Sequence, residues 1–168
     1  AESTAGGIKG QGNFQTEGGP SGAVTLKAKD DISFDTIVTD GWSTSAAGGA
    51  VTVNSTAGSV TGDTINANGG AGADGGSVTV TAAKNVDLYF VQASGGYSTE
   101  TPGGKGGTVT ITATAGSVLI GDELLANGGN SSYGIGGDGG SVKIIAGQDI
   151  GVGEFPSAEF PYGRSVSI

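Results

Sequence analysis

The residues of this chain that could do chemistry are almost all carboxylates. The 168 residues include 16 Asp and Glu, but no Cys, His or Met, so thiolate and imidazole chemistry is excluded. Asp35, Asp63 and Asp122 recur at one position of a repeat, where Tyr89 interrupts them. Stacked carboxylates repel one another unless a hard cation such as calcium lies between them. The simpler interpretation is that they are solvated turn residues, and we expect neither a metal nor a cofactor.

A catalytic role would need a different arrangement of these groups. An enzyme acting on polysaccharides needs a carboxylate pair, or a basic side chain beside acidic ones, on one face. The basic residues are few and scattered, at Lys9, Lys27, Lys29, Lys84, Lys105, Lys143 and Arg164. We therefore predict no catalytic residue, and a polysaccharide-active enzyme remains a minor alternative.

The charge balance limits the partners. A net charge of −9 and a pI of about 4.1 argue against nucleic acid and anionic membranes, because both attract Lys and Arg. No apolar stretch approaches the about 18 residues that span a bilayer, so we expect no membrane insertion. The start at Ala1 is what a chain looks like after a signal peptide is removed. We expect an extracellular or cell-surface location.

The elements that must position these residues come from a repeated phrase. Gly22-Ala-Val-Thr-Leu26 recurs with small changes at 49–53, 76–80, 107–111 and 140–144. Its apolar residues alternate with polar ones, which is typical of β-strands. Repeats of about 20 to 50 residues indicate a solenoid, in which each unit buries its apolar face against its neighbours.

Each repeat resolves into three short strands without a helix between them. The first strand turns Val24, Leu26 and Ala28 inward, and the second and third carry the inward pairs Ile32/Phe34 and Ile37/Thr39. This pattern predicts an all-β, right-handed parallel β-helix of about six coils. We expect a single domain over 1–168: a partial N-terminal coil at 1–21, five repeats at 22–157, and a C-terminal segment at 158–168.

A polar column and a Gly-rich loop follow the third strand. Asp40, Asn68, Ser94 and Asn127 share this position and can form hydrogen bonds along the stack. We expect the Gly after each of them to supply a positive φ. The loops vary in length and should project from one edge. Three of them carry an aromatic residue that could stack on a sugar ring, contact a neighbouring fibre or cover its own loop: Trp42, Tyr97 and Tyr133.

These motifs resemble a known family. Gly-Gly-x-Val-Thr-Val-x-Ala, followed by Val-x-x-Gly and then by Ile-x-Ala-Asn-Gly-Gly, is similar to the haemagglutinin-type repeats of large secreted bacterial exoproteins, the filamentous-haemagglutinin-like adhesins. The resemblance covers residues 22–157. It implies a right-handed β-helix on a cell surface. The chain is far shorter than such adhesins and shows no separate secretion-targeting domain.

The two ends suggest assembly. Residues 163–168 repeat the first-strand phrase a sixth time, and the residues around Phe14 align with those around Ile65, so we expect the chain to begin at the second strand. The tail of one copy and the head of the next would then complete one shared coil. Unpaired strand edges template the addition of another chain, and a head-to-tail contact that does not close makes a filament.

The sequence therefore predicts a homopolymer, the structural subunit of an extracellular filament. Its interface would include Ile8, Phe14, Phe155, Phe160, Tyr162, Val166 and Ile168. The alternative is a fragment of a large surface adhesin. A minor alternative is ice binding by the outward threonines Thr25, Thr52, Thr79 and Thr110, although Thr is also a common exposed strand residue.

Overall fold

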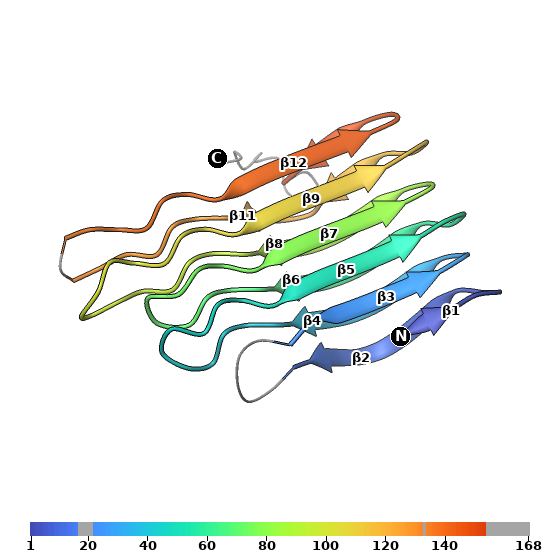
Figure 1. Ribbon diagram of the computed structural model, residues 1–168. Coiled ribbons are helices and arrows are strands. Elements are labelled where there is room, and N and C mark those ends of the chain that lie inside the picture. Colours follow the sequence, from blue (N-terminus) through green and yellow to red (C-terminus); the bar gives the residue numbers. More distant parts are fainter. Residues whose placement is uncertain (17–21, 133, 154–168) are drawn as a thin grey trace, which may run out of the picture.

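The computed structural model describes residues 1–16, 22–132 and 134–153, and these form a parallel β-solenoid of about five turns. Figure 1 shows the coils stacked side by side, with the colour advancing by one coil at each step. The all-β parallel β-helix predicted from the repeat is confirmed. Within these ranges no helix is long and apolar enough to cross a membrane.

Two parallel sheets form the solenoid. The first sheet holds six strands in the order β1 (Glu2–Ser3), β3 (Val24–Ala28), β5 (Ala50–Ser55), β7 (Ser77–Ala82), β9 (Thr108–Ala113) and β12 (Ser141–Ala146). The second sheet contains β2 (Ile8–Gln15), β4 (Ile32–Val38), β6 (Val60–Asn66), β8 (Val86–Gln92), β10 (Val118–Ile120) and β13 (Ile150–Val152), with β11 (Leu124–Leu125) also pairing with β8.

The repeat aligns without a slip in the first sheet. The valines of the repeated phrase pair one above another, from Val24 through Val51, Val78 and Val109 to Val142. A one-residue shift would turn every apolar side chain to the solvent, so burial of one face fixes this register. The predicted inward columns are correct.

The core lies between the two sheets. Leu26, Val53, Val80 and Ile111 form one column and are fully buried. The corner column of small residues is also buried, at Ala28, Ser55, Ala82 and Ala113. In the second sheet Phe34 pairs with Gly62, and the Phe34 ring occupies the space that a Cβ on Gly62 would need. A glycine in this column therefore makes room for the aromatic ring of the coil beside it.

The predicted second and third strands join in most coils. In β4, β6 and β8 they form one seven-residue strand. The register pairs of these strands skip one column, which holds Asp35, Asp63 and Tyr89. In the next coil the two segments are separate, as β10 and β11.

The start of the chain differs from the prediction. Glu2 and Ser3 form β1 and pair with Lys27 and Ala28, so the chain supplies part of its own first strand and does not begin at the second. The Ala1 ammonium group donates a hydrogen bond to the carbonyl oxygen of Thr25 at 2.6 Å. Glu2 and Ser3 do not carry the alternating apolar residues of the repeated phrase, so the sequence pattern did not predict this strand. The expectation that the chain begins at the second strand is therefore wrong, whereas the shared coil stays a prediction.

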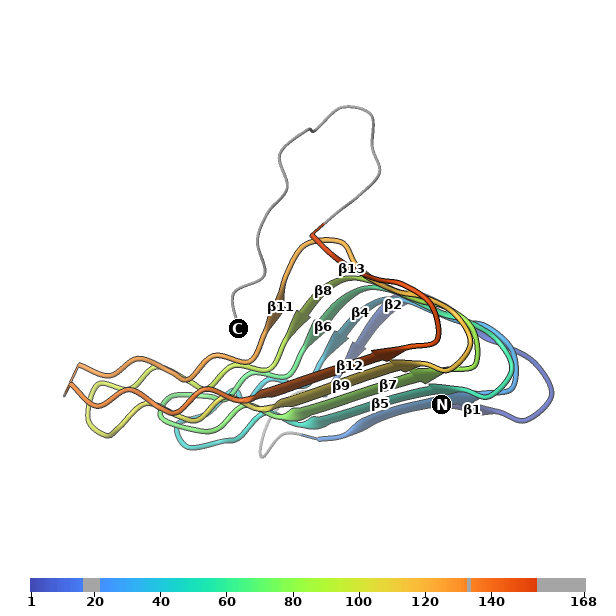
Figure 2. The same cartoon turned by 90° about the horizontal axis from the view of Figure 1, so that it is seen from above.

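In the described part of the chain, the Gly-rich loops form four long arms on one side of the solenoid (Figure 2). We call them arm 1 (residues 39–49), arm 2 (67–76), arm 3 (93–107) and arm 4 (126–140). Each arm has an outgoing and a returning segment, and both segments follow a regular wave. Arms 1, 2 and 4 contain residues of positive φ: Ser45, Gly72 and Gly134.

Candidate interface: the open coil end and the glycine arms

The arms are built from a triplet of one outward residue and two glycines. The outgoing segments carry Asn68-Gly-Gly70, Ser94-Gly-Gly96 and Asn127-Gly-Gly129, and arm 1 has Asp40-Gly-Trp42 in their place. The returning segments carry Ala47-Gly-Gly49, Asp74-Gly-Gly76, Lys105-Gly-Gly107 and Asp138-Gly-Gly140. A three-residue period is that of extended polyproline-II-like chains, which have no hydrogen bonds of their own and must find partners in neighbouring chains.

Those partners lie in two directions. The first glycine of a triplet donates along the stack, as from Gly69 N–H to Ser94 O at 2.9 Å and from Gly106 N–H to Asp138 O at 2.8 Å. The second glycine joins the two layers. In a returning triplet it donates to the outgoing segment of the same arm, as from Gly76 N–H to Ala67 O at 2.7 Å. In an outgoing triplet it donates to the returning segment of the preceding arm, as from Gly96 N–H to Ala73 O at 2.9 Å. The arms are therefore a two-layer, hydrogen-bonded extension of the solenoid.

Close approach of the backbones explains the glycines. A Cβ on Gly96 would overlap the carbonyl oxygen of Gly70 in the coil before it, and a Cβ on Gly106 would overlap that of Ala126. The expectation of a positive φ after the polar column is wrong, because in the described residues only Gly72, Gly134 and Gly153 among the glycines have one. The glycines supply space between chains, as glycine does at the axis of collagen.

The polar column forms a directional ladder along the outgoing segments. The Oδ1 atom of Asp40 accepts the N–H of Asn68 at 2.7 Å, and Asn68 Oδ1 accepts the N–H of Ser94 at 2.9 Å. Ser94 Oγ then accepts the N–H of Asn127 at 3.3 Å. Each side chain thus serves the main chain of the following coil. The predicted hydrogen bonding along this column is confirmed.

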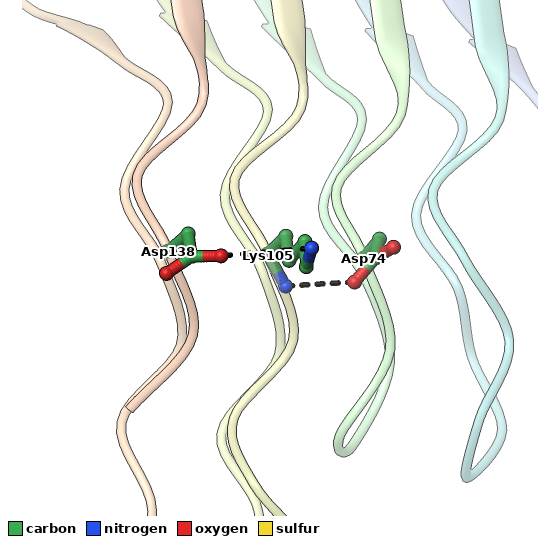
Figure 3. Close-up of polar contacts among 3 residues, drawn as sticks. All are labelled: Asp74, Lys105 and Asp138. Atoms are coloured by element: carbon green, nitrogen blue, oxygen red, sulfur yellow. Dashed lines mark hydrogen bonds and ion pairs between the residues drawn. The ribbon is translucent and has the colours of Figure 1, made fainter. Parts of the chain in front are cut away.

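The returning segments show the same direction (Figure 3). Asp74 Oδ1 accepts the N–H of Lys105 at 2.7 Å, and the Lys105 ammonium group lies 3.5 Å from the Asp138 carboxylate. Lys105 and Asp138 are both exposed, so water and salt screen this ion pair and it adds little stability.

One end of the stack is open in the described residues. The N–H groups of Ser141 and Gly147 bond back to Gly107 and Ala113. Because main-chain groups alternate along a strand, those of Val142, Ile144 and Ala146 point away from β9. The inward side chains of β12 are only half-buried, whereas Ile111, the column neighbour of Ile144, is fully buried. This end presents both unpaired main-chain groups and apolar surface.

The opposite end is also uncovered in part. β1 covers only the last two residues of β3. Ile8 and Phe14 lie on β2, the outer strand of the second sheet, and pack half-buried against the core. These two predicted interface residues therefore lie at one end of the solenoid. The other predicted interface residues, Phe155, Phe160, Tyr162, Val166 and Ile168, lie outside the described residues.

The predicted aromatic contacts lie on the arms but do not form a common platform. Trp42 occupies the position of Gly70 and Gly96, where a Cβ points toward the preceding coil, and it is 65% exposed. The Tyr97 hydroxyl forms a hydrogen bond with Ser132 of arm 4. Tyr133 lies outside the described residues.

The chemically interesting carboxylates do not form a metal site. Asp35, Asp63 and Asp87 line a shallow, open depression together with Tyr89 and the Phe34 ring. Among the residues that the structure describes, no group of three or more acidic side chains could hold a metal ion. The arrangement is that of exposed carboxylates on a sheet face.

The outward threonines form a regular row. Thr25, Thr52, Thr79 and Thr110 are in register, and Lys143 follows them. A second row contains Lys27, Asn54, Thr81 and Thr112. Only two neighbouring coils therefore carry a complete Thr-x-Thr pair.

Sequence reasoning missed the arms as an ordered element. The signal was present, since the Gly-Gly triplet recurs on both sides of each loop, for example at 68–70 and 74–76.

No protein-family model, curated protein or solved structure matches the chain.

Proposed function

We propose that this chain is a structural module that builds an extracellular filament by stacking the β12/β13 end of one copy on the β1/β2 end of the next. The observation that carries the proposal is a column that is accessible at both ends. It runs from Ile8 through Ile32, Val60, Val86 and Val118 to Ile150. Ile150 is 52% exposed at one end, and Ile8 is half-buried at the other.

Continuing the pairing registers aligns both sheets at once. In the second sheet, Ile8 of the next copy would lie over Ile150. In the first sheet, Glu2 shares a column with Lys27 and, further along, with Ile145, so Glu2 and Ser3 of the next copy would lie over Ile145 and Ala146. Such a contact buries apolar surface and pairs open strand edges, as successive coils do inside the chain. Because the contact is head-to-tail, it propagates.

The contact we propose differs from a shared coil. β1 already occupies part of the first-strand position, so the junction joins the β12/β13 edge to the β1/β2 edge and needs no exchange of a strand. The phrase at 163–168 remains a candidate to lie beside the uncovered part of β3, and removing it tests that role.

An electron-microscopy experiment with two matched variants tests the proposal. Native protein should form fibres one solenoid wide at high concentration, and sedimentation should show growth with concentration. Ile144→Lys places a charge in the apolar column at the open end, which should prevent stacking. Thr79→Lys adds the same charge at an exposed outward position of β7, in the middle of the stack and away from both ends, and should leave assembly intact.

Assembly is compared only between variants that fold. Circular dichroism and thermal melting first establish that both variants fold. A native protein that stays monomeric at high concentration, or two variants that assemble equally, would contradict the proposal.

A second candidate rests on the same open edges. In a large adhesin of the haemagglutinin-repeat type, further coils of one longer chain would cover them. The mass of the native material separates the candidates, since a much larger chain supports the adhesin. Neither candidate gives the protein a catalytic role. Both place it outside the cell, with surface glycans or neighbouring fibres as partners of the exposed arm residues.

A further inference from the structure

The chain contains two copies of one reactive tetrapeptide. Ala67-Asn-Gly-Gly70 and Ala126-Asn-Gly-Gly129 have the same sequence and occupy equivalent positions in arms 2 and 4. Their intrinsic chemistry is therefore the same, and any difference between them in the folded protein comes from the surrounding structure.

In the arm 2 copy, both the Asn68 side chain and the N–H of the following residue form hydrogen bonds. The side-chain oxygen of Asn68 accepts the N–H of Ser94 at 2.9 Å, and its Nδ2 group donates to Gln92 Oε1 at 3.2 Å. The N–H of the following residue, Gly69, donates to Ser94 O at 2.9 Å. Both the side chain and the next main-chain nitrogen are thus committed to neighbouring groups.

Among the described residues, the copy in arm 4 lacks these bonds. Asn127 is exposed, and its own N–H bonds back to Ser94 Oγ. Within residues 1–16, 22–132 and 134–153, no group bonds to the Asn127 side chain or to the N–H of Gly128. Arm 4 is the last described arm, so the coil that would supply both partners is missing from the described stack.

We propose that Asn127 is a site of spontaneous modification, which converts it to aspartate and isoaspartate in the folded protein. The main-chain nitrogen of Gly128 attacks Cγ of Asn127, forming an N–Cγ bond. The Cγ–Nδ2 bond breaks, and ammonia leaves with the proton that Gly128 nitrogen gives up. Water then opens the resulting cyclic imide at either carbonyl carbon. Water is the only co-reactant, and no oxidation or reduction occurs.

The same step is suppressed at Asn68. Attack by Gly69 nitrogen requires the loss of its bond to Ser94 and rotation of a side chain that holds two further hydrogen bonds. Opening such bonds before each reaction lowers the rate in proportion to the open population. Since each bond contributes modestly to stability, we expect Asn127 to react at least about tenfold faster than Asn68.

The product changes the open end of the stack. Aspartate adds a negative charge to a chain that already carries −9. Isoaspartate also lengthens the main chain by one carbon, which disrupts the triplet period at the surface where a further Gly-Gly segment would pair. The modification does not require filament formation, because it needs only that the Asn127 side chain and the Gly128 N–H have no partner, as among the described residues of a single copy; a further copy stacked on this end would slow it.

Peptide mapping of the full chain tests the proposal. Dilute folded protein is kept in neutral to mildly alkaline buffer, sampled over weeks, and digested briefly under mildly acidic conditions. Trypsin cleavage after Lys29, Lys84, Lys105 and Lys143 places Asn68 and Asn127 on different peptides. Mass spectrometry then gives the deamidated fraction at each site, and fragmentation distinguishes isoaspartate from aspartate.

Unfolded protein is the control. In urea both tetrapeptides should react at similar rates, so a difference seen only in the folded chain belongs to the structure. Equal folded-state rates at the two sites, or a faster reaction at Asn68, would overturn the proposal. Because dilute monomer is used, the outcome does not depend on whether the protein forms fibres.

Discussion

Asn68 Oδ1 accepts the main-chain N–H of Ser94 at 2.9 Å, and so the side chain of one arm completes the backbone of the next. The same relationship joins Asp40 to Asn68 and Asp74 to Lys105. At a corner of the solenoid, Asp31 accepts the N–H of Ser59 at 2.8 Å in the same way. Polar side chains in this protein therefore connect coils mainly through the main chain of their neighbour.

Replacing Asn68 should measure the value of this contact. In Asn68→Ala the N–H of Ser94 loses its acceptor, and the expected loss in the free energy of unfolding is about 1 kcal/mol. Asn127→Ala is the matched control, because within the described residues the Asn127 side chain accepts no hydrogen bond. Urea denaturation of both variants makes the comparison, and equal losses would contradict the ladder.

The glycines of the arms should differ in their tolerance of a side chain. Gly106 and Gly139 hold the same triplet position in neighbouring arms, but a Cβ on Gly106 meets the Ala126 carbonyl whereas one on Gly139 meets nothing within 4 Å. We expect Gly106→Ala to cost about 1–3 kcal/mol, as overpacking does. Gly139→Ala should stay within about 0.5 kcal/mol of the native protein.

Thermal or chemical unfolding of the two alanine variants decides the point. Equal tolerance would mean that the arms do not pack as closely as the structure shows. A loss at Gly139 comparable to that at Gly106 would indicate that another chain covers arm 4 under the conditions used.

Two variants, each with a different end blocked, should form a heterodimer when they are mixed. Ile8→Lys places a charge at the β2 end, and Ile144→Lys places one at the β12 end, so neither variant alone should polymerise. In a mixture, the intact β12 end of the first variant can bind the intact β2 end of the second. The expected product is a dimer of one copy of each, seen by native mass spectrometry. Fibres in the mixture, or dimers of a single variant, would argue against head-to-tail stacking.

Trp42 should act between fibres and not within them. It is the most exposed large apolar side chain in the described residues, at 65%, and it lies on a projecting arm. Trp42→Ser should reduce side-by-side bundling of fibres in electron micrographs while leaving single fibres intact. Tyr89→Ser, which changes an aromatic residue of the second sheet face, is the control. Loss of single fibres in Trp42→Ser would place Trp42 in the stacking contact itself.

The sequence was sufficient to predict what depends on burial. Val51, Val53 and Ser55 alternate with polar residues at the same place in each repeat, so burial of one face fixed both strand and register. The interruption of the pairing at Asp35 and Asp63 depends on how two short strands join, and composition does not specify it. β1 was missed because its pairing with Lys27 and Ala28 is mostly a main-chain interaction.

The arms show a different limit. Their glycines were interpreted as turn residues, although the order comes from contacts between chains that are far apart in sequence, such as Gly96 with Ala73. A period of three, read on both sides of each loop, would have predicted extended chains with close neighbours. The residues proposed here for the stacking contact, Ile144 and Ile150, could be predicted only once the open end of the solenoid was seen.

The direction of the hydrogen bonds also determines how the molecule would respond to force. Strands run across the solenoid, so the bonds between coils lie along its axis, and tension applied from end to end loads successive coil contacts in series. From arm 1 to arm 4 each contact includes both sheets and two layers of arm backbone. In the first sheet, the contact of β1 with β3 involves only two paired residues. A stretched molecule should therefore open first at its amino-terminal coil, and this early opening would spare the contacts between the other coils.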